Sequence, residues 1–199
     1  PADVAIVGVP THLTSISPTG AQATPVAIRA ALSRYSTYSW SHDIDLASIV
    51  ARDGGDVLSP DGEEGIARVI ERTSELAAQS RLLIALGGDN SLTYSVALGV
   101  WGGRLPASGL VTLDAHHDLR DGVSNGSPVR RLVEAGLSGR HVVQIGIADF
   151  SNSPEYAARA RDLGITVVTR DALRRRPMSD VMTEALTIEA NARVGDAVK

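Results

Sequence analysis

The stretch LVTLDAHHDLR, residues 110–120, decides the fold class and raises the first chemical question. Its apolar half has the length and composition of a fully buried β-strand. Four titratable residues follow the apolar run directly: Asp114, His116, His117 and Asp118. Because ligands in open parallel sheets bind beyond the carboxyl ends of the strands, this cluster lies where a functional site is expected.

Five further apolar runs have the same character, and segments with helical spacing separate most of them. The runs are 4–9, 81–86, 141–147, 164–169 and a weak last one at 196–199. The helical segments are 24–35, 61–80, 127–137, 153–164 and 178–195. Continuous apolar strands that alternate with helices predict an α/β domain with a mostly parallel sheet, covered on both faces. We interpret residues 1–199 as one domain, in which 36–61 is the least readable stretch.

Two of the helical segments carry more detailed signals. In the first, Thr24 is a suitable cap for a helix with Pro25 in its first turn. In 61–80, helical spacing places six residues on one face: Ile66, Val69, Ile70, Thr73, Leu76 and Ala77.

The bulk composition excludes several classes of function. A net charge of −4 gives no basic footprint, so nucleic acid is not an expected partner. No apolar run approaches the roughly 18–20 residues of a membrane span. The N-terminus lacks the basic-then-apolar order of a secretory signal. The absence of cysteine excludes disulfides and thiolate metal sites, and it fits a protein of the cytoplasm.

Asp114, His116 and Asp118 are spaced i, i+2, i+4, which points all three side chains to one side if the backbone stays extended. Two carboxylates and an imidazole that converge in a cleft repel one another or titrate unless a cation lies between them. Mixed oxygen and nitrogen ligands suit Mn²⁺, Fe²⁺ or Zn²⁺. The alternative is that these residues only form a turn or cap a helix.

Two neighbouring motifs favour the metal site. GGDNS (87–91) follows the preceding apolar run, and SNGSPVR (124–130) comes shortly after the cluster. With GVP (8–10) and TPVAIRAAL (24–32), this ordered set resembles the arginase/agmatinase/formimidoylglutamase family of binuclear manganese ureohydrolases. The resemblance covers nearly the whole chain and implies a three-layer α/β/α sandwich around a parallel sheet.

By resemblance, Asp114 bridges two Mn²⁺ ions, His116 binds one ion and Asp118 binds the other. His117 falls at the variable position of the motif, where we expect it to line the pocket or to support a ligand. Asn90 stands where most of the family has a histidine ligand. A neutral amide oxygen is a weaker ligand than imidazole, so the ion beside Asn90 should be held less tightly.

Two further departures from the family pattern matter. Asn125 stands where arginases and agmatinases have histidine, so a titratable proton shuttle is missing. A late strand-end D-x-D motif that supplies the remaining ligands is also absent, because the one D-x-D here, at 43–45, comes far too early. The chain begins without Met and stops at Lys199, where a strand should begin, so we expect further sequence with that motif to follow.

The loop that follows the cluster predicts the kind of substrate. Arg120 lies two residues beyond Asp118, where its guanidinium could grip a carboxylate with two parallel hydrogen bonds. Further residues that we expect to contact the substrate are Asn125, Ser127 and Arg130. The hydroxyl of Ser127 and the helix N-terminus after it would add donors for an anion. The alternative is that the arginines, including Arg131, only solvate the surface.

The resemblance is strongest to the formimidoylglutamases, enzymes of histidine degradation that hydrolyse N-formimino-L-glutamate to L-glutamate and formamide. A cationic pocket would accept this small substrate, with its two carboxylates, and would repel agmatine. Two alternatives stay open: another ureohydrolase (agmatinase, guanidinobutyrase or arginase), or a non-catalytic arginase-fold binding protein. We also expect a homo-oligomer.

Overall fold

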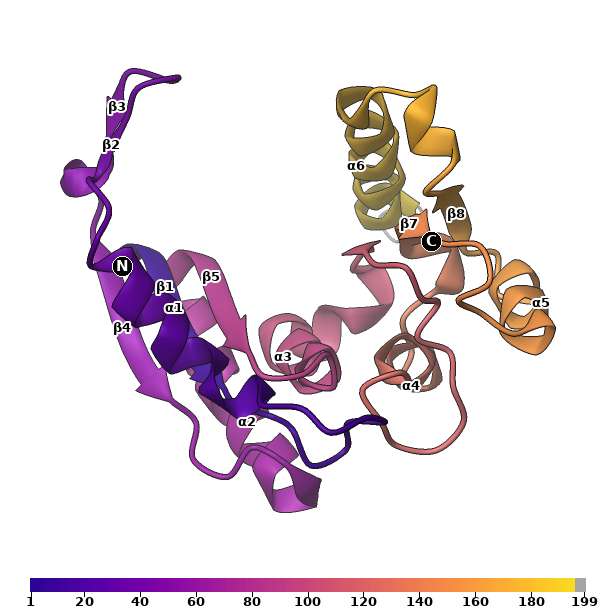
Figure 1. Ribbon diagram of the computed structural model, residues 1–199, viewed down its shortest axis with the longest axis horizontal. Helices are drawn as coiled ribbons and strands as arrows, with labels where there is room; N and C mark the ends of the chain where they lie inside the picture. The colour runs from indigo at the N-terminus through magenta and orange to yellow at the C-terminus, as the bar shows by residue number, and fades with distance from the viewer. Residues whose placement is uncertain (196–199) are drawn as a thin grey trace. The chain divides into compact units, whose positions relative to one another are not determined.

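The computed structural model of the chain describes residues 1–195. The chain divides into two compact units, which are described separately below (Figure 1). The N-terminal unit is Pro1–Val100, and the C-terminal unit is Trp101–Lys199.

The N-terminal unit is built on three parallel strands in the order β4-β1-β5. They are β1 (Ala2–Val9), β4 (Ala51–Asp56) and β5 (Ser80–Gly87). The helices are α1 (Thr24–Leu32), α2 (Gly62–Ala78) and α3 (Leu92–Trp101), with short 3₁₀ turns at Ala21–Ala23 and Leu46–Ser48. Two short strands, β2 (Tyr38–Ser39) and β3 (Ile44–Asp45), form an antiparallel pair.

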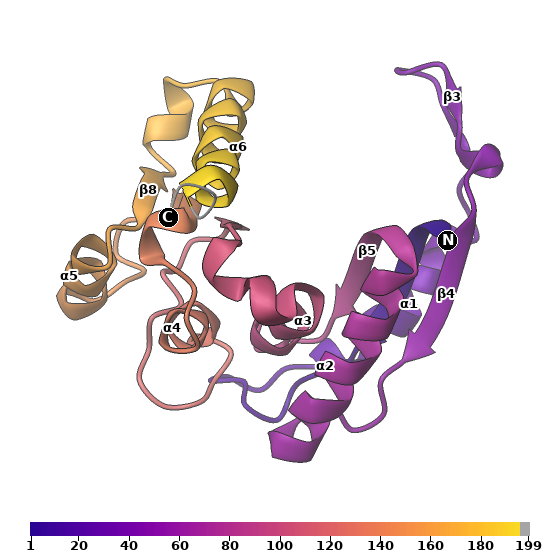
Figure 2. The same ribbon diagram turned by 180° about the vertical axis from the view of Figure 1, so that it is seen from behind.

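Helices α1 and α2 cover opposite faces of this sheet, as the two opposed views show (Figures 1 and 2). The alternation of side chains along β1 explains the arrangement. Val7 and Val9 belong to a buried cluster with Val69 and Leu76 of α2. Gly8, between them, faces the other way, where a Cβ atom would collide with the Asp56 carboxylate of β4 and would lie 2.9 Å from the Pro25 Cβ of α1. A glycine at this position therefore lets α1 approach the sheet closely.

The C-terminal unit is built on three further parallel strands in the order β6-β7-β8. They are β6 (Leu110–Leu113), β7 (Val142–Ile147) and β8 (Thr166–Thr169). The helices are α4 (Pro128–Glu134), α5 (Pro154–Asp162) and α6 (Met178–Gly195), with 3₁₀ turns at Gly102–Ala107, Gly139–His141 and Ala172–Arg174. Val181 and Ala185 of α6 pack against Val143, Ile145 and Val168 of the sheet.

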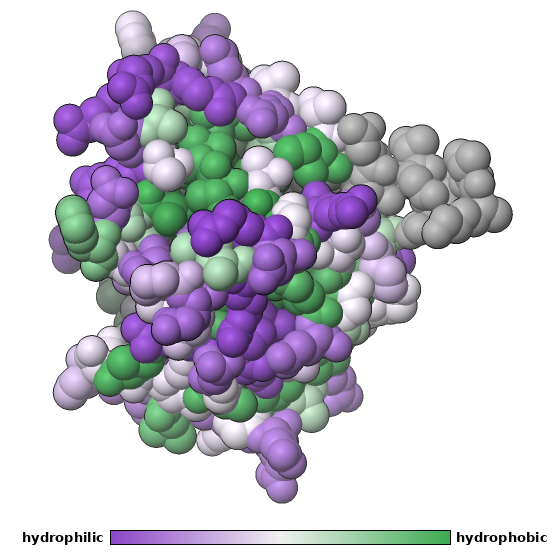
Figure 3. Space-filling view, turned by 90° about the vertical axis from the view of Figure 1, so that its right-hand side faces the viewer, coloured by the Kyte–Doolittle hydropathy of each residue, from purple (hydrophilic) through white to green (hydrophobic). Residues whose placement is uncertain are grey.

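The predicted α/β class with mostly parallel strands is confirmed, and the five strong apolar runs correspond to β1, β5, β6, β7 and β8. The weak run at 196–199 lies outside the described residues. The six residues assigned to one face of α2 are all buried or half-buried. On the side of the molecule drawn in Figure 3, apolar residues lie among hydrophilic ones. Among the residues that the structure describes, no helix combines the length and apolar character needed to span a membrane.

Three local features differ from the sequence analysis. Strand β4 and helix α3 were not singled out from the sequence, and β4 is an edge strand made largely of polar and glycine residues. The assignment of Thr24 as a helix cap is wrong: Ala23 is the N-cap residue, and Thr24 is the first residue of α1.

Candidate functional site

The carboxyl end of β6 brings Asp114 and His116 together. The Asp114 N–H donates to the Ile145 carbonyl across a distance of 3.0 Å, which extends the contact between β6 and β7 beyond Leu113. Oδ1 of Asp114 accepts a 2.8 Å hydrogen bond from the His116 N–H and lies 3.1 Å from His116 Nδ1. The two side chains are 32% and 58% exposed, respectively, so the C-terminal unit presents a carboxylate and an imidazole side by side at its surface.

Asp118 does not continue this arrangement. The chain bends after β6 at residues 115–116, and Asp118 has a positive φ of 54°. The premise of an extended backbone from Asp114 to Asp118 is therefore wrong. Asp118 is also buried, with 7% of its surface exposed. Among the described residues, no three His, Asp or Glu side chains form a group that could hold a metal ion. The role of Asp118 as a ligand stays a prediction.

The donor atoms of Asp114 and His116 nevertheless fit a divalent transition metal in kind. Carboxylate oxygen and imidazole nitrogen are ligands that Mn²⁺ and its neighbours accept. A carboxylate offers about four lone-pair positions on two oxygens, so the two contacts of Oδ1 with the His116 N–H and Nδ1 leave capacity for a cation. The pair supplies part of a ligand set, and further ligands must come from other residues.

Asn90, the remaining predicted ligand, belongs to the N-terminal unit and lies between β5 and α3. Its Oδ1 atom accepts a 2.9 Å hydrogen bond from the Thr93 hydroxyl. This bond fixes the orientation of the Asn90 amide. Its neighbour Gly88 is required by packing, because a Cβ atom there would lie 2.3 Å from the Thr11 nitrogen.

Asp89, which precedes Asn90, has a structural role that the sequence analysis did not assign. Its side chain, in a residue that is 8% exposed, accepts hydrogen bonds from the Ser15 hydroxyl and from both the hydroxyl and the N–H of Ser91. Its backbone exchanges two bonds with Thr11. Asp89 thus ties the segment after β1 to the segment after β5.

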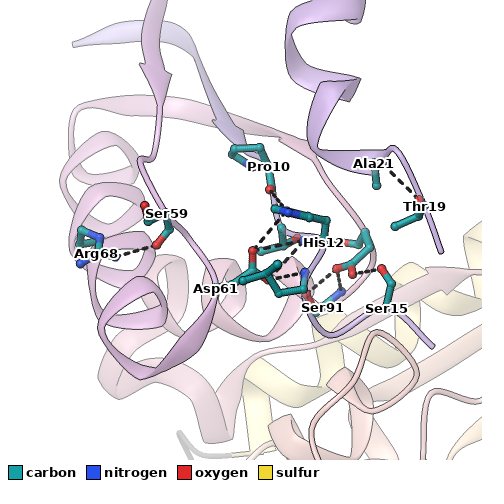
Figure 4. Close-up of polar contacts among 12 residues, drawn as sticks. Pro10, His12, Ser15, Thr19, Ala21, Ser59, Asp61, Arg68 and Ser91 are labelled. Carbon is teal, nitrogen blue, oxygen red and sulfur yellow. Dashed lines mark hydrogen bonds and ion pairs between the residues drawn. The ribbon is translucent and has the colours of Figure 1, made fainter. Parts of the chain in front are cut away.

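A second carboxylate holds the segment after β1 from the other side. Asp61, at the start of α2, accepts hydrogen bonds of 3.2 Å from the His12 N–H and 3.1 Å from the Leu13 N–H. The His12 Nδ1 atom lies 3.5 Å from the same carboxylate (Figure 4). Asp61 is the N-cap residue of α2, but its side chain makes no cap hydrogen bond.

The predicted substrate residues of the C-terminal unit fall into two groups. Arg120 is exposed, and its guanidinium carbon lies 5.8 Å from the centre of the Tyr156 ring. Arg159 lies 5.7 Å from the same ring centre and donates to the carbonyl of Leu119. The Tyr156 ring therefore lies close to both guanidinium groups. Its contact with Arg120 could not be predicted, because the two residues are 36 positions apart in the sequence.

Arg130 and Ser127 are instead committed to their own loop. The Arg130 guanidinium donates to the carbonyls of Arg120 and Gly122 and to the Glu134 carboxylate. This arrangement favours a loop-stabilising role for Arg130 over the predicted contact with substrate. Ser127 is completely buried, and its hydroxyl donates to the Ser124 carbonyl at 2.8 Å. The structure does not support its predicted contact with an anion. Asn125 is half-buried in the same loop.

His117, expected to line the pocket or support a ligand, is buried at 4% exposure, and its Nδ1 atom lies 2.6 Å from Gln144 Oε1. Sequence reasoning did not identify Gln144 or Asn152, which bonds to the same loop. The available signal was the polar Gln144 in the middle of the apolar run 141–147.

Comparison with known proteins adds independent evidence. The sequence pattern described as "Arginase family" matches residues 2–195. A formimidoylglutamase from Halalkalibacterium halodurans is 37% identical over 190 residues, which cover 91% of this chain and 59% of that protein. The chain thus spans about 60% of the length of the curated relatives it matches.

Solved structures show the same fold. The crystal structure of formimidoylglutamase from Bacillus subtilis matches with a TM-score of 0.86 at 31% identity, covering 94% of this chain and 61% of that one. Formiminoglutamase from Trypanosoma cruzi, crystallised with Mn²⁺, matches with a TM-score of 0.85 at 22% identity, covering 94% of this chain and 67% of that one. The second likeness concerns the fold alone.

Proposed function

The chain belongs to the arginase family, and from this premise we propose that the whole protein hydrolyses N-formimino-L-glutamate to L-glutamate and formamide. The observation that carries the proposal is that one loop, between β6 and α4, presents two kinds of chemistry. It exposes the carboxylate–imidazole pair of Asp114 and His116, and a few residues later the guanidinium of Arg120. The 37% identity to a formimidoylglutamase supports the choice of substrate.

The cofactor in this proposal is manganese, which the T. cruzi relative contains. Asp114 and His116 would hold it, together with Asp118 and, for a second and more weakly held ion, Asn90. Manganese supplies Lewis acidity and lowers the pKa of water, so that a hydroxide nucleophile is available near neutral pH. The hydrogen bond from the His116 backbone N–H to Asp114 Oδ1 orients the carboxylate before any cation binds.

Arg120 reads the far end of the substrate in this proposal. A guanidinium can bind a carboxylate through two parallel hydrogen bonds, whereas it repels the ammonium group of agmatine. The Tyr156 ring beneath Arg120 restricts the orientations of the guanidinium and reduces the entropy lost on binding. The substrate would therefore be a small molecule with carboxylates. The cytoplasmic location and the homo-oligomeric state also stay predictions.

The test is an activity panel on the full-length protein supplemented with Mn²⁺. The substrates are formiminoglutamate, agmatine, arginine and guanidinobutyrate, and the assay follows formamide or urea release. We expect formiminoglutamate to have the highest kcat/KM. Efficient turnover of agmatine would overturn the assignment of the substrate. The absence of turnover on all four would favour a non-catalytic arginase-fold binding protein.

A further inference from the structure

The peptide groups on both sides of His116 are held by two amide side chains from elsewhere in the C-terminal unit. Gln144 Nε2 donates to the His117 carbonyl at 2.8 Å. Asn152 Oδ1 accepts from the His117 N–H at 2.9 Å, and Asn152 Nδ2 donates to the Ala115 carbonyl at 3.0 Å. These three bonds fix the backbone immediately before and after His116.

Gln144 makes two contacts with His117 from within the sheet. It lies on β7, the central strand of its sheet, and it is completely buried. A polar amide in such a position costs free energy unless its hydrogen bonds are made. Both ends of the amide are satisfied by one residue, since Nε2 bonds to the His117 carbonyl and Oε1 contacts the His117 ring.

This reciprocal contact also fixes the tautomer of His117. Because Gln144 Nε2 must donate to the His117 carbonyl, Oε1 is the atom that faces His117 Nδ1. An amide oxygen can only accept a hydrogen bond, so the proton of this bond lies on His117 Nδ1. The His117 side chain is thereby locked inward, while its neighbour His116 points to the exposed side.

We propose that His117, Gln144 and Asn152 form a positioning clasp that holds Asp114 and His116 in the orientation required for binding a metal ion. The clasp makes its bonds through the backbone of the loop and through the His117 ring, and it leaves the side chains of Asp114 and His116 to each other and to solvent. The metal-binding part of this inference rests on the proposed function.

The test compares Mn²⁺ affinity with stability in the full-length protein. Gln144→Leu and Asn152→Ala each remove two bonds of the clasp. The matched control is Ser108→Ala, which removes a 2.9 Å hydrogen bond from a buried hydroxyl of the same unit, away from the loop. Mn²⁺ binding is measured by the electron paramagnetic resonance signal of free Mn²⁺, and stability by the melting temperature of the metal-free protein.

We expect both clasp variants to weaken Mn²⁺ binding by about 10- to 100-fold, as removal of a group that orients a metal ligand typically does. Ser108→Ala should lower the melting temperature without this loss of affinity. The ¹⁵N shifts of the His117 ring should show the Nδ1-protonated form in the wild type and lose that preference in Gln144→Leu. Because Asn152→Ala changes a half-buried loop residue, it keeps the test decisive if Gln144→Leu does not fold.

The outcomes separate the two proposals. If the wild type binds Mn²⁺ and the clasp variants bind it as tightly as Ser108→Ala does, the positioning role is overturned and the proposed function stands. If the wild-type protein binds no Mn²⁺, the proposed function is overturned, and the metal-positioning role falls with it. An Nε2-protonated His117 in the wild type would overturn the clasp itself.

Discussion

Two loops of this protein, the segment after β1 and the segment after β6, each follow a parallel strand, but different groups hold them in place. In the segment after β1, the loop is held by carboxylates, since Asp61 and Asp89 accept hydrogen bonds from its N–H and hydroxyl groups. In the segment after β6, the residues next to Asp114 are held by the side-chain amides of Gln144 and Asn152. Asp114 therefore keeps most of its acceptor capacity.

The difference separates two kinds of carboxylate, which we call structural where the carboxylate stabilises the fold and chemical where it remains available to a ligand. A carboxylate surrounded by its own chain's donors stabilises the fold and has little capacity left for a ligand. A carboxylate whose loop is fixed by neutral amides can be rigid and still available. By this criterion Asp89 of GGDNS is structural and Asp114 of DAHHD is chemical, although both lie within two residues of the carboxyl end of a strand.

The largest expected effect comes from Asp114→Ala. A bound metal supplies several kcal/mol of transition-state stabilisation, and roughly each 1.4 kcal/mol is tenfold in rate. We expect kcat/KM for formiminoglutamate to fall on the order of 10²-fold or more, with loss of bound Mn²⁺. Unfolding stability should change by only about 0.5 kcal/mol, because the side chain is partly exposed. An Asp114→Ala variant that retains Mn²⁺ and activity would show that Asp114 is not a metal ligand.

The reverse pattern is expected for Asp89→Ala. The change leaves one N–H and two hydroxyl groups without their acceptor in a buried position. Unsatisfied buried donors cost about 1–3 kcal/mol each, and hydroxyl groups can turn to new partners, so we expect a loss of about 2–3 kcal/mol in unfolding free energy. Urea unfolding of the metal-free full-length protein measures it, with Asp162→Ala, at an exposed position, as the control. Equal midpoints for the two variants would contradict the structural role.

These predictions depend on features that the sequence reveals unevenly. The strands β1, β5, β6, β7 and β8 were predictable because each is a continuous apolar run, and α2 because its buried face repeats with helical spacing. Strand β4 was not, because ARDGGD pairs through backbone groups at a sheet edge and shows no apolar pattern.

The site was predictable only in part. The motif located Asp114 and His116, whose contact is local. It could not show that Asp118 adopts a positive φ, which an aspartate tolerates but does not require. It also could not show the clasp, because Gln144 and Asn152 lie 27 and 35 residues from His117 and meet it only in the folded unit.

Arg120 and Arg130 extend the comparison within the loop after β6, since one guanidinium lies on an aromatic ring and the other is bonded to backbone carbonyls. Loss of a charge-assisted contact costs about 1.5–3 kcal/mol, or roughly 10- to 150-fold in kcat/KM. We expect this loss for Arg120→Ala with formiminoglutamate, unchanged Mn²⁺ content, and partial recovery in Arg120→Lys. Arg130→Ala should mainly lower the melting temperature. Undiminished turnover by Arg120→Ala would show that the loop does not read a carboxylate.

The smallest expected effect concerns Asn90. This residue is next to the structural Asp89 in the sequence and is nevertheless a predicted metal ligand, so it tests whether the segment after β5 is only structural. Imidazole is a stronger ligand for manganese than an amide oxygen. Asn90→His should therefore slow the loss of the weakly held ion by about tenfold, which corresponds to roughly 1.4 kcal/mol. The measurement is metal content over time during dialysis of the full-length protein.

Thr93→Val is the matched control, because it removes the hydroxyl that bonds to Asn90 Oδ1 without adding an imidazole. If the Thr93→Val control loses manganese faster than the wild type does, the Thr93 hydroxyl orients the Asn90 amide toward the ion. If Asn90→His and the wild type lose manganese at the same rate, Asn90 is not a ligand, and the whole segment after β5 is structural.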